Sequence, residues 1–336
     1  MAARVAINGM GRIGRAAFKI IMETPQLELV AVNDIADPAN IAYLLKYDTV
    51  YGRYNKTVEL DGGDLVVDGT PIRFLQEKDP TQLPWGEMNV DIVIESTGVF
   101  TRMQDLQKHA QAGAKWVILS APAKDEDTPT VVHGVNAAQA DARVISCASC
   151  TTNALAPVME ILDRHFGVDK AQMTTIHAYT SSQGIVDSPA KKWRRGRAGA
   201  ANFVPTTTGA AIATTKALPQ LEGRFDGVAV RGPVPSGSLI DLTALLKRDT
   251  TVEELNQVFR AEAADRYKGV LEASDDELVS SDILGTSAAS IVDLGMTQVV
   301  GGNMVKVMAW YDNEWGYTSQ LVREALRIAE TQATPA

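Results

Sequence analysis

The sequence has only two cysteines, few histidines and no long apolar run, and each shortage argues against a class of protein. Two closely spaced cysteines in 336 residues do not provide a disulfide framework, and they suit a reducing compartment. No apolar stretch reaches the roughly 18 residues that a membrane span requires. The opening residues, "MAARVAING", are too short and too strand-like for a secretory signal. We therefore expect a cytoplasmic protein with no membrane segment.

Positive charge is also in short supply, because 32 basic residues face 41 acidic residues and give a formal charge of -9. This balance disfavours a general nucleic-acid binder. One segment departs from it: "KKWRRGR", Lys191 to Arg197, has five basic residues among seven positions. Nucleic acid is therefore expected only as a secondary partner, through this segment.

The chain is long for a single core, so two domains are expected. Strand and helix patterns alternate in the first half, beginning with the strands Arg4 to Asn8 and Leu27 to Asp34. This alternation predicts a mostly parallel sheet covered on both faces. The segment "VELDGGDLVVDGTPIRF" has turn signals at Asp61-Gly62 and Asp68-Gly69 and predicts hairpins. After Cys150 a helix pattern is followed by long β-rich segments, which predict an α+β domain with a larger antiparallel sheet. A last helix is expected from about Tyr317 to Thr331.

The segment "NGMGRIG" places Gly9, Gly11 and Gly14 in the spacing of the dinucleotide-binding fingerprint. A strand precedes it, a helix follows it, and Asp34 lies 20 positions after Gly14 (34 − 14 = 20). Gly9 allows a tight turn, and Gly11 lets the backbone approach a pyrophosphate at the helix N-terminus. Asp34 accepts hydrogen bonds from a ribose hydroxyl and repels a 2′-phosphate. The pattern therefore predicts NAD rather than NADP, and the alternative is a strand–helix turn without a ligand.

The two cysteines, Cys147 and Cys150, allow three interpretations: a metal site, a redox pair or a nucleophile. No histidine has metal-site spacing from them, so no metal is expected; the histidines are His109, His133, His165 and His177. A redox pair is disfavoured because its first cysteine usually opens a helix, whereas Cys147 follows a strand pattern. Cys150 instead precedes the helix pattern "TTNALAPVME", whose N-terminus favours a thiolate. His177 in "TTIHAYT" is the candidate base, although an isolated strand histidine is more often a core residue.

Several motifs in order, "NGMGRIGR", "SCTTN", "TTIHAYT", "PTTTGAA" and "WYDNEWGY", resemble those of phosphorylating glyceraldehyde-3-phosphate dehydrogenases. The resemblance extends from Val5 to about Ala329. It implies a Rossmann-type NAD-binding domain over 1–149 and a catalytic domain over 150–316. A C-terminal helix over 317–336 then packs back on the first domain. It also implies a homotetramer that converts glyceraldehyde 3-phosphate, inorganic phosphate and NAD into 1,3-bisphosphoglycerate and NADH.

The resemblance also implies roles for individual residues. It assigns Cys150 as the nucleophile and His177 as the base. Beyond the three glycines, matching cofactor positions are Arg12, Ile13, Asp34, Lys78, Ser120 and Asn313. The positions that bind the attacking phosphate in the family match Ser149, Thr151, Thr208 and Gly209. The positions that bind the phosphate of the substrate match Thr180 and Arg231, and a further anion-binding position matches Arg195.

The chain departs from the family pattern at several of these places. Cys147 replaces the usual Asn, and it is either a small buried residue or a partner that resolves an oxidised Cys150 as a disulfide. Ser182 replaces a common acid, and "GPVPSGS" replaces the usual run after Arg231. Ser188 replaces a Leu found in strict NAD users, but Asp34 still favours NAD.

Two other functions remain open from the sequence. Erythrose-4-phosphate dehydrogenase is similar to this chain, although "PTTTGAA" and "WYDNEWGY" favour the triose enzyme. A non-catalytic NAD-binding or RNA-binding module is disfavoured because Cys150 and His177 are both present.

Overall fold

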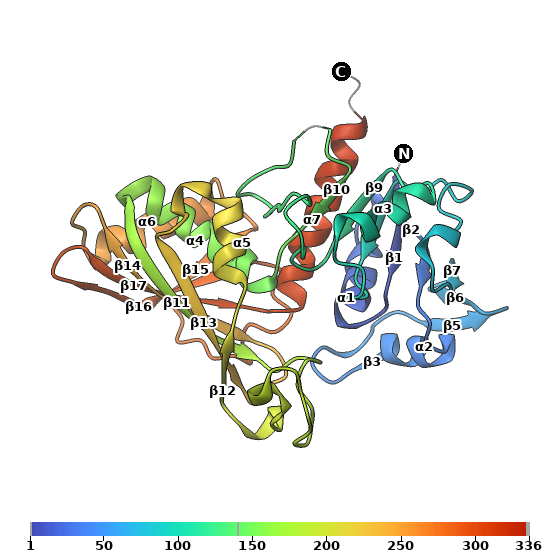
Figure 1. The fold of residues 1–336 in the computed structure, drawn as a ribbon, viewed down its shortest axis with the longest axis horizontal. Coiled ribbons are helices and arrows are strands. Elements are labelled where there is room, and N and C mark those ends of the chain that lie inside the picture. Colours follow the sequence, from blue (N-terminus) through green and yellow to red (C-terminus); the bar gives the residue numbers. More distant parts are fainter. Residues whose placement is uncertain (1, 140, 334–336) are drawn as a thin grey trace. The chain divides into compact units, whose positions relative to one another are not determined.

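The computed structural model describes residues 2–139 and 141–333, which form two compact units. Unit 1 contains the chain up to Val131, the segment Ala137–Ala148 and the chain from Leu321 onward. Unit 2 contains Val132–Asn136 and Ser149–Gln320. Figure 1 labels their elements along the chain. Of the segments predicted from the sequence, residues 1 and 334–336 lie outside the described residues.

The sheet of unit 1 has the strand order β10-β9-β8-β1-β2-β7-β6-β5 within the described residues. Neighbouring strands from β10 to β7 pair in parallel, whereas β7, β6 and β5 form the antiparallel hairpins expected from their Asp-Gly turns. The strands are β1 (Ala3–Asn8), β2 (Leu27–Asn33), β5 (Val58–Asp61), β6 (Asp64–Val67), β7 (Thr70–Leu75), β8 (Ile92–Glu95), β9 (Trp116–Leu119) and β10 (Val144–Ser146). A separate two-stranded ribbon pairs β3 (Tyr47–Asp48) with β4 (Gly52–Arg53).

Both faces of this sheet are buried. On β1, Val5 and Ile7 belong to one apolar cluster, while Ala6 between them belongs to another around Trp85. This alternation is expected of a parallel sheet covered on both faces. The helices are α1 (Arg12–Ile21), α2 (Pro38–Lys46), α3 (Met103–Gln111) and the part of α7 (Trp315–Ala333) from Leu321 onward, with the short 3₁₀ helix η1 (Pro80–Gln82).

The sheet of unit 2 has the order β12-β13-β11-β14-β17-β16-β15 within the described residues. It is mixed: β11 pairs in parallel with β13 and antiparallel with β14. The strands are β11 (Val168–Ala178), β12 (Val204–Thr207), β13 (Phe225–Gly232), β14 (Ser238–Leu246), β15 (Leu271–Ser274), β16 (Ser290–Val300) and β17 (Met304–Tyr311).

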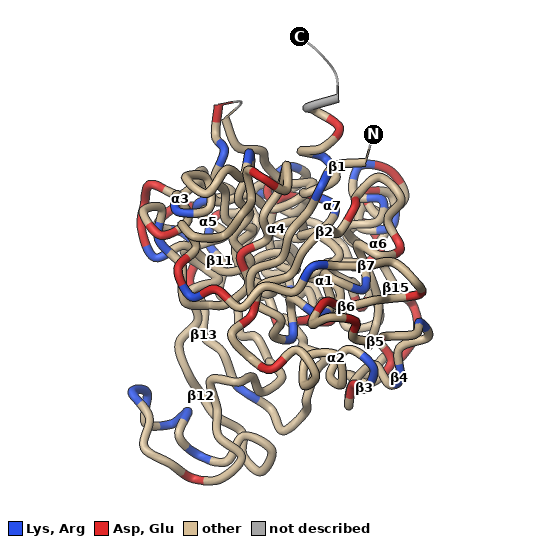
Figure 2. Tube along the Cα trace, turned by 90° about the vertical axis from the view of Figure 1, so that its right-hand side faces the viewer, with Lys and Arg blue, Asp and Glu red and all other residues tan. Residues whose placement is uncertain are grey.

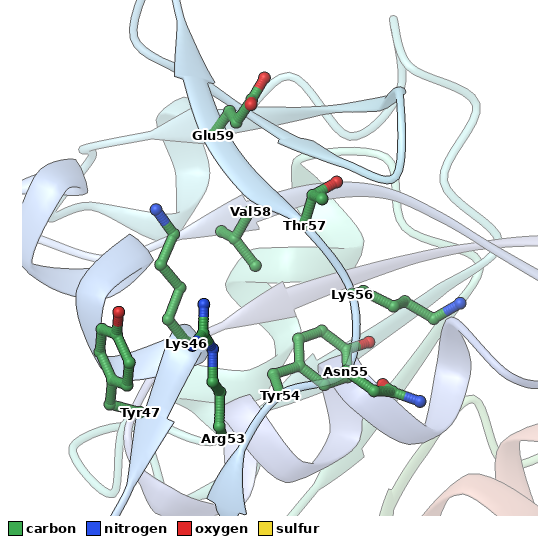
Figure 3. A pocket seen from close by; sticks show the side chains of 9 residues that line it. All are labelled: Lys46, Tyr47, Arg53, Tyr54, Asn55, Lys56, Thr57, Val58 and Glu59. Carbon is green, nitrogen blue, oxygen red and sulfur yellow. The ribbon is translucent and has the colours of Figure 1, made fainter.

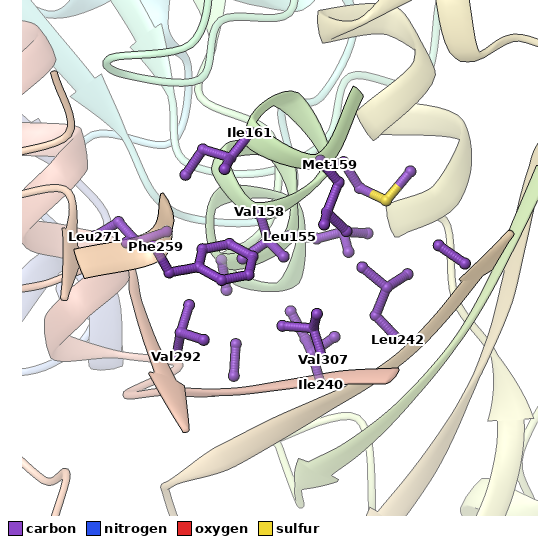
Figure 4. Close-up of a cluster of buried hydrophobic side chains, with 14 of the residues drawn as sticks. Leu155, Val158, Met159, Ile161, Ile240, Leu242, Phe259, Leu271, Val292 and Val307 are labelled. Carbon is purple, nitrogen blue, oxygen red and sulfur yellow. The ribbon is translucent and has the colours of Figure 1, made fainter. Parts of the chain in front are cut away.

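Helices pack on one face of the unit 2 sheet and form its apolar core. They are α4 (Cys150–Phe166), α5 (Ala210–Ala217) and α6 (Val252–Ala264), and the short helices are η2 (Trp193–Gly196), η3 (Gly199–Ala201) and η4 (Pro219–Leu221). Leu155 and Val158 of α4 meet Leu242 of β14 and Val307 of β17 in this core (Figure 4). The predicted α/β class, a doubly wound parallel sheet followed by an α+β domain with a large mixed or antiparallel sheet, is confirmed, and the second sheet is mixed.

Candidate active site

Cys150 and His177 lie within contact distance of each other in unit 2. Cys150 is the first residue of α4, which Ser149 caps by accepting a hydrogen bond from the Thr152 N–H at 3.1 Å. His177 lies near the end of β11 and is buried. The distance from Cys150 Sγ to His177 Nε2 is 3.4 Å. This separation permits direct proton exchange between a nucleophile and its base.

Burial and the charge of Arg231 act on the pKa values of this pair. Burial raises the pKa of the Cys150 thiol, while the positive charge of Arg231 acts in the opposite direction. Burial also lowers the pKa of His177, and Arg231 lowers it further, to about 3. The position of Cys150 at the helix N-terminus favours the thiolate, as expected from the sequence, and burial of the site acts against it.

Two arginines near this pair have no carboxylate partner among the described residues. Arg231 Nη1 lies 2.9 Å from His177 Nδ1 and donates to the Ala178 carbonyl oxygen at 3.0 Å, and the buried Nε of Arg231 has no hydrogen-bond partner. Arg195 Nε donates to Thr206 Oγ1 at 3.0 Å. Burial lowers the pKa of both guanidinium groups, and Arg195 contributes to the effect on Arg231. Two partly buried cations without anions form a binding site for an anionic ligand.

Hydroxyl groups lie beside these arginines. Thr180 Oγ1 is 2.9 Å from Ser182 Oγ, and Arg195 Nη1 lies 3.5 Å from the same Ser182 oxygen. Because Ser182 has a hydroxyl and no carboxylate, the charge of Arg195 is not neutralised there.

Two of the predicted phosphate-binding residues lie at the start of α5. Thr208 Oγ1 accepts from the Ala210 N–H at 3.1 Å, at the start of α5. Gly209 is the N-cap of α5, and a Cβ placed on it would meet no heavy atom within 4 Å. The exposed backbone of Gly209 therefore leaves room for a ligand to approach.

The sequence analysis gave no role to Tyr311, which the structure places at the site. Its hydroxyl is 2.9 Å from Thr151 Oγ1 and 2.8 Å from Thr175 Oγ1. Its ring lies edge-on to the His177 ring, with 6.0 Å between centroids. Tyr311 thereby links α4, β11 and β17 beside the catalytic pair. The segment "MVKVMAWY" reads as a strand, and alternate positions of a strand face the same side, so Tyr311 would be expected on the same side as Val305 and Val307. In the structure these alternate positions are the buried ones of β17.

Asn313 is held by the segment that follows β13, through residues 236–238. Its Oδ1 accepts from Ser238 Oγ at 2.9 Å and from the Gly237 N–H at 3.1 Å, and Ser236 Oγ lies 3.3 Å away. Ser238 Oγ also accepts from the Ala178 N–H at 3.1 Å. These contacts occupy the amide oxygen of Asn313, so a ligand would meet its Nδ2 as a hydrogen-bond donor.

A cavity of about 380 Å³ lies at the carboxyl ends of the central strands of unit 1, and its lining includes four predicted cofactor residues: Gly9, Gly11, Asp34 and Lys78. Gly9 has a φ of +98°, and a Cβ there would lie 2.6 Å from the Thr97 nitrogen. A Cβ on Gly14 would lie 1.9 Å from the Gly9 oxygen, whereas one on Gly11 would meet nothing within 4 Å. Glycine is thus required at 9 and 14 by the protein itself, and Gly11 leaves space for a pyrophosphate. The residues fit the predicted dinucleotide.

Asp34 and Lys78 line the same cavity. The Asp34 carboxylate accepts from the Met10 N–H at 2.7 Å and the Ala36 N–H at 2.9 Å, which fixes its orientation. The other predicted residues of unit 1 do not line this cavity: Gly14 packs against the Gly9 backbone, and the remaining three have other contacts. Arg12 pairs with Asp48 and lies over the Tyr51 ring, Ile13 packs against the apolar core, and Ser120 donates its N–H to the Glu95 carbonyl.

Cys147 is part of the buried core of unit 1 and is 3% exposed. Burial, with the nearby charge of Glu324, raises its pKa well above the usual value. Both cysteines are present as thiols, without a disulfide. Among the described residues, no group of three or more His, Cys, Asp or Glu side chains is arranged to hold a metal ion.

Two basic features lie outside these sites. A cavity of about 340 Å³ in unit 1 is lined by Lys46, Arg53 and Tyr54, among other residues, and by none of the predicted site residues (Figure 3). The loop preceding β12 is rich in basic residues (Figure 2), but Lys192 donates to Thr207 Oγ1 and Arg197 pairs with Asp187.

The sequence of this chain is similar to those of known proteins over nearly its whole length. The sequence model described as "Glyceraldehyde 3-phosphate dehydrogenase, NAD binding domain" matches residues 3–103, and the one described as "Glyceraldehyde 3-phosphate dehydrogenase, C-terminal domain" matches residues 149–313. The glyceraldehyde-3-phosphate dehydrogenase of Streptomyces coelicolor is 51% identical over 327 residues, covering 96% of this chain and 97% of the relative. That of Geobacillus stearothermophilus is 49% identical over 332 residues, covering 98% and 99%.

Proposed function

The chain belongs to the glyceraldehyde 3-phosphate dehydrogenase family, and we propose that Cys150 and His177 are the residues that carry its reaction. The protein is an NAD-dependent enzyme that oxidises glyceraldehyde 3-phosphate in the presence of inorganic phosphate to 1,3-bisphosphoglycerate. The observation that supports the proposed roles is the 3.4 Å contact between Cys150 Sγ and His177 Nε2 at the N-terminus of α4.

The first step is addition of the thiol to the aldehyde. His177 Nε2 takes the proton of Cys150, and the sulfur forms a bond to the aldehyde carbon. The carbonyl electron pair moves to oxygen, where the N–H groups at the start of α4 stabilise the negative charge. The imidazolium returns its proton to this oxygen, which gives a hemithioacetal and restores neutral His177. The lowered pKa of His177 favours this return.

The second step is oxidation of the hemithioacetal. NAD supplies the hydride acceptor. His177 Nε2 takes the hydroxyl proton, and the oxygen electron pair re-forms the carbonyl, leaving a thioester on Cys150. A phosphate oxygen then attacks the thioester carbon, and the Cys150 sulfur leaves as a thiolate that takes the proton from His177. This step yields the acyl phosphate and regenerates the resting pair.

We assign the two anions to the uncompensated cations of unit 2. Arg231 and Thr180 bind the phosphate of the substrate, because the unpaired Nε of Arg231 requires an acceptor. Inorganic phosphate binds at the two helix starts, with Arg195 contributing charge to both anions. The residues at the helix starts are Ser149, Thr151, Thr208 and Gly209.

We assign NAD to the residues predicted from the sequence. Gly9, Gly11 and Gly14 accommodate the pyrophosphate at the start of α1, and Asp34 accepts hydrogen bonds from the ribose. The additional cofactor residues in unit 1 are Arg12, Ile13, Lys78 and Ser120. In unit 2, Nδ2 of Asn313 donates to the oxygen of the nicotinamide carboxamide.

The domain roles follow from these assignments. We propose that residues 1–149 bind NAD, that 150–316 carry the chemistry, and that the C-terminal segment 317–336 belongs with the NAD-binding domain. Leu321 and Ile328 lie in the apolar core of unit 1, which supports the last assignment.

We propose that the enzyme is a homotetramer in the cytoplasm. Ile176, Val228 and Met304 are 37%, 53% and 44% exposed on strands of unit 2, and a second copy would cover apolar side chains of this kind. The thiol state of both cysteines suits a reducing compartment. None of the helices in the described ranges is long and apolar enough to cross a membrane.

A nucleic-acid role remains secondary. It would use Lys191, Arg194 and their neighbours in the loop up to Arg197. RNA binding that weakens with salt, and that is lost when these two residues become glutamine, supports it; binding unchanged by both tests excludes this loop.

The test of the proposed function is NADH formation from glyceraldehyde 3-phosphate with and without inorganic phosphate. Continuous turnover only with phosphate is expected, because the thioester needs an acceptor. A single burst in both conditions would retain Cys150 as the nucleophile and reject the phosphate assignments. Faster turnover of erythrose 4-phosphate would reject the triose as the preferred substrate.

A further inference from the structure

Ser238 is the first residue of β14, the strand that lies between β11 and β17 in the sheet of unit 2. It pairs with Tyr311, the last residue of β17, and Leu239 beside it pairs with Ile176 near the end of β11. Both neighbouring strands run antiparallel to β14, so both end level with its start. Ser238 therefore lies where the chain leaves these two strands.

The hydroxyl group of Ser238 contacts the chain on both sides. Its oxygen accepts from the N–H of Ala178, the residue after His177, at 3.1 Å, and it lies 2.9 Å from Asn313 Oδ1. A serine hydroxyl has one proton and two lone pairs. Because the backbone N–H occupies a lone pair, the proton is available for the Asn313 oxygen. Ser238 is 1% exposed, so water does not compete for this proton.

The backbone of Gly237 determines which atom of the Asn313 amide lies here. An amide side chain can be turned so that its oxygen and nitrogen exchange places. The N–H of Gly237 only donates, and it lies 3.1 Å from this atom, so the atom is the oxygen. Gly237 has a φ of +88°, and a Cβ on it would lie 2.2 Å from the Ser280 oxygen. Glycine is thus required for the turn that directs this N–H at Asn313.

Ser236, in the same turn, has a different main partner. Its hydroxyl lies 3.2 Å from Asp312 Oδ1 and 3.3 Å from Asn313 Oδ1. A carboxylate is the stronger acceptor, so the Ser236 proton goes to Asp312, which backbone N–H groups also hold in place. Gly237 and Ser238 are therefore the two donors that hold the amide oxygen of Asn313.

We propose that Ser238 is a positioning residue for the oxidation step. Its proton holds the amide oxygen of Asn313, so that Nδ2 is kept as the donor for the nicotinamide carboxamide of NAD. The same hydroxyl binds the backbone next to His177, so one side chain joins the base to the residue that orients the hydride acceptor. This inference rests on the proposed roles of Asn313 and His177.

Loss of the hydroxyl would change what Asn313 presents to NAD. With one of its two donors removed, the amide is free to turn. A turned amide directs its oxygen at the oxygen of the carboxamide, and two acceptors repel each other. The effect should be confined to the nicotinamide end of the cofactor, because Ser238 has no contact with unit 1 among the hydrogen bonds of the described residues.

The direct test uses calorimetry of the full-length protein with two ligands, NAD and ADP-ribose. ADP-ribose has the adenine, the riboses and the pyrophosphate of NAD but no nicotinamide. We expect Ser238→Ala to raise the Kd of NAD about tenfold, for the loss of one buried hydrogen bond, and to leave the Kd of ADP-ribose within about twofold. A merely structural role would not distinguish the two ligands. Equal weakening of both, or unchanged NAD binding, overturns the proposal.

Two further serine variants provide the controls. Ser236→Ala removes a hydroxyl from the same turn, and we expect it to leave the Kd of NAD within about twofold of wild type, because that proton goes to Asp312. An effect as large as that of Ser238→Ala would contradict the assignment of the donors. Ser238→Cys keeps a weak donor and should weaken NAD binding less than Ser238→Ala does. If Ser238→Ala does not fold, the comparison of NAD with ADP-ribose in Ser238→Cys decides.

A double-mutant cycle shows whether Ser238 acts through Asn313. Asn313→Ala removes the amide itself, so adding Ser238→Ala to it should weaken NAD binding no further. Effects of the two changes that multiply would mean that Ser238 acts independently of Asn313, and would reject the positioning role.

The two levels of inference fail separately. Phosphate-dependent oxidation of glyceraldehyde 3-phosphate by the wild type, with no selective loss of NAD binding in Ser238→Ala, retains the function and rejects the positioning role. Selective loss of NAD binding in Ser238→Ala, without that oxidation by the wild type, supports the positioning role and rejects the proposed reaction.

Discussion

The two units build their ligand sites from different parts of the chain. In unit 1 the predicted cofactor turn between β1 and α1 is one continuous segment, and its shape depends on glycines. Gly9 and Gly14 permit the close backbone contacts of the turn, and Gly11 leaves space for a ligand. In unit 2 the site is made by side chains that are far apart in sequence, with Cys150, His177, Arg231 and Tyr311 on four different elements.

The difference determines how each site fails. In the continuous turn, an added side-chain atom would clash with the closely packed backbone, so a substitution there affects the fold of the unit. A change in the dispersed site removes one chemical group while the core beneath it remains. The expected effects below begin with the largest.

Removing the nucleophile should abolish the chemistry of unit 2 while leaving NAD binding in unit 1 unchanged. We expect Cys150→Ala to lower kcat by about 1,000-fold or more, because no other group can form the thioester. NAD binding in unit 1 should remain within about twofold of wild type, measured by calorimetry. Cys147→Ala is the control, and activity comparable to wild type is expected for it. Substantial turnover by Cys150→Ala would exclude the thioester route.

A methyl group in the cofactor turn should disrupt unit 1. The added Cβ of Gly14→Ala would lie 1.9 Å from the Gly9 oxygen. We therefore expect the free energy of unfolding to fall by about 3 kcal/mol and NAD binding to weaken. In the Gly14→Ala protein, iodoacetamide should still alkylate Cys150 as in the wild type, because the change leaves unit 2 intact. Gly11→Ala is the matched control, with wild-type melting and weaker NAD binding. A Gly14→Ala protein that melts like the wild type would contradict the structure of the turn.

Acid should destabilise the protein through His177. Its folded pKa of about 3 lies below the usual 6.5, so the unfolded state binds more protons in that interval and stability falls as the pH falls through it. Between pH 7 and about pH 5 this effect amounts to about 2 kcal/mol. Denaturant titration should show the effect in wild type and in Cys150→Ala, and not in His177→Asn. Equal acid sensitivity in all three proteins would exclude a buried neutral imidazole.

The smallest expected effect concerns the anion site. Ser182→Asp places a carboxylate near Arg195 and should raise KM for glyceraldehyde 3-phosphate by roughly fivefold, about 1 kcal/mol. The KM for NAD should not change. Ser182→Asn has similar size without the charge and should resemble the wild type. A KM equally raised in both variants would indicate a steric rather than an electrostatic cause.

The sequence predicted contiguous features well. The cofactor fingerprint with Asp34, the hairpins after α2 and the start of α4 at Cys150 are all local patterns, and each is found in the structure. The fold class also followed from strand–helix alternation, because parallel strands need covered faces.

Contacts between distant segments were not predictable in the same way. Nothing local in "VRGPVPSGS" indicates that Ser238 fixes Asn313, or that Arg231 reaches the far nitrogen of His177. Burial acts against the expected thiolate at Cys150, and it depends on what packs around the sulfur, which the helix pattern does not specify. Tyr311 was missed because its hydroxyl partners lie 160 and 136 positions away.

The last helix has a consequence for how the protein is made. The strands of unit 1 come from the first 146 residues, yet its core also contains Leu321, Val322, Ala325 and Ile328 of α7. Chains are synthesised from the N-terminus, and a domain folds as a unit once its parts are present. The ribosome therefore finishes the whole of unit 2 before it releases the residues that close unit 1. The half of the protein that begins first is the half that is completed last.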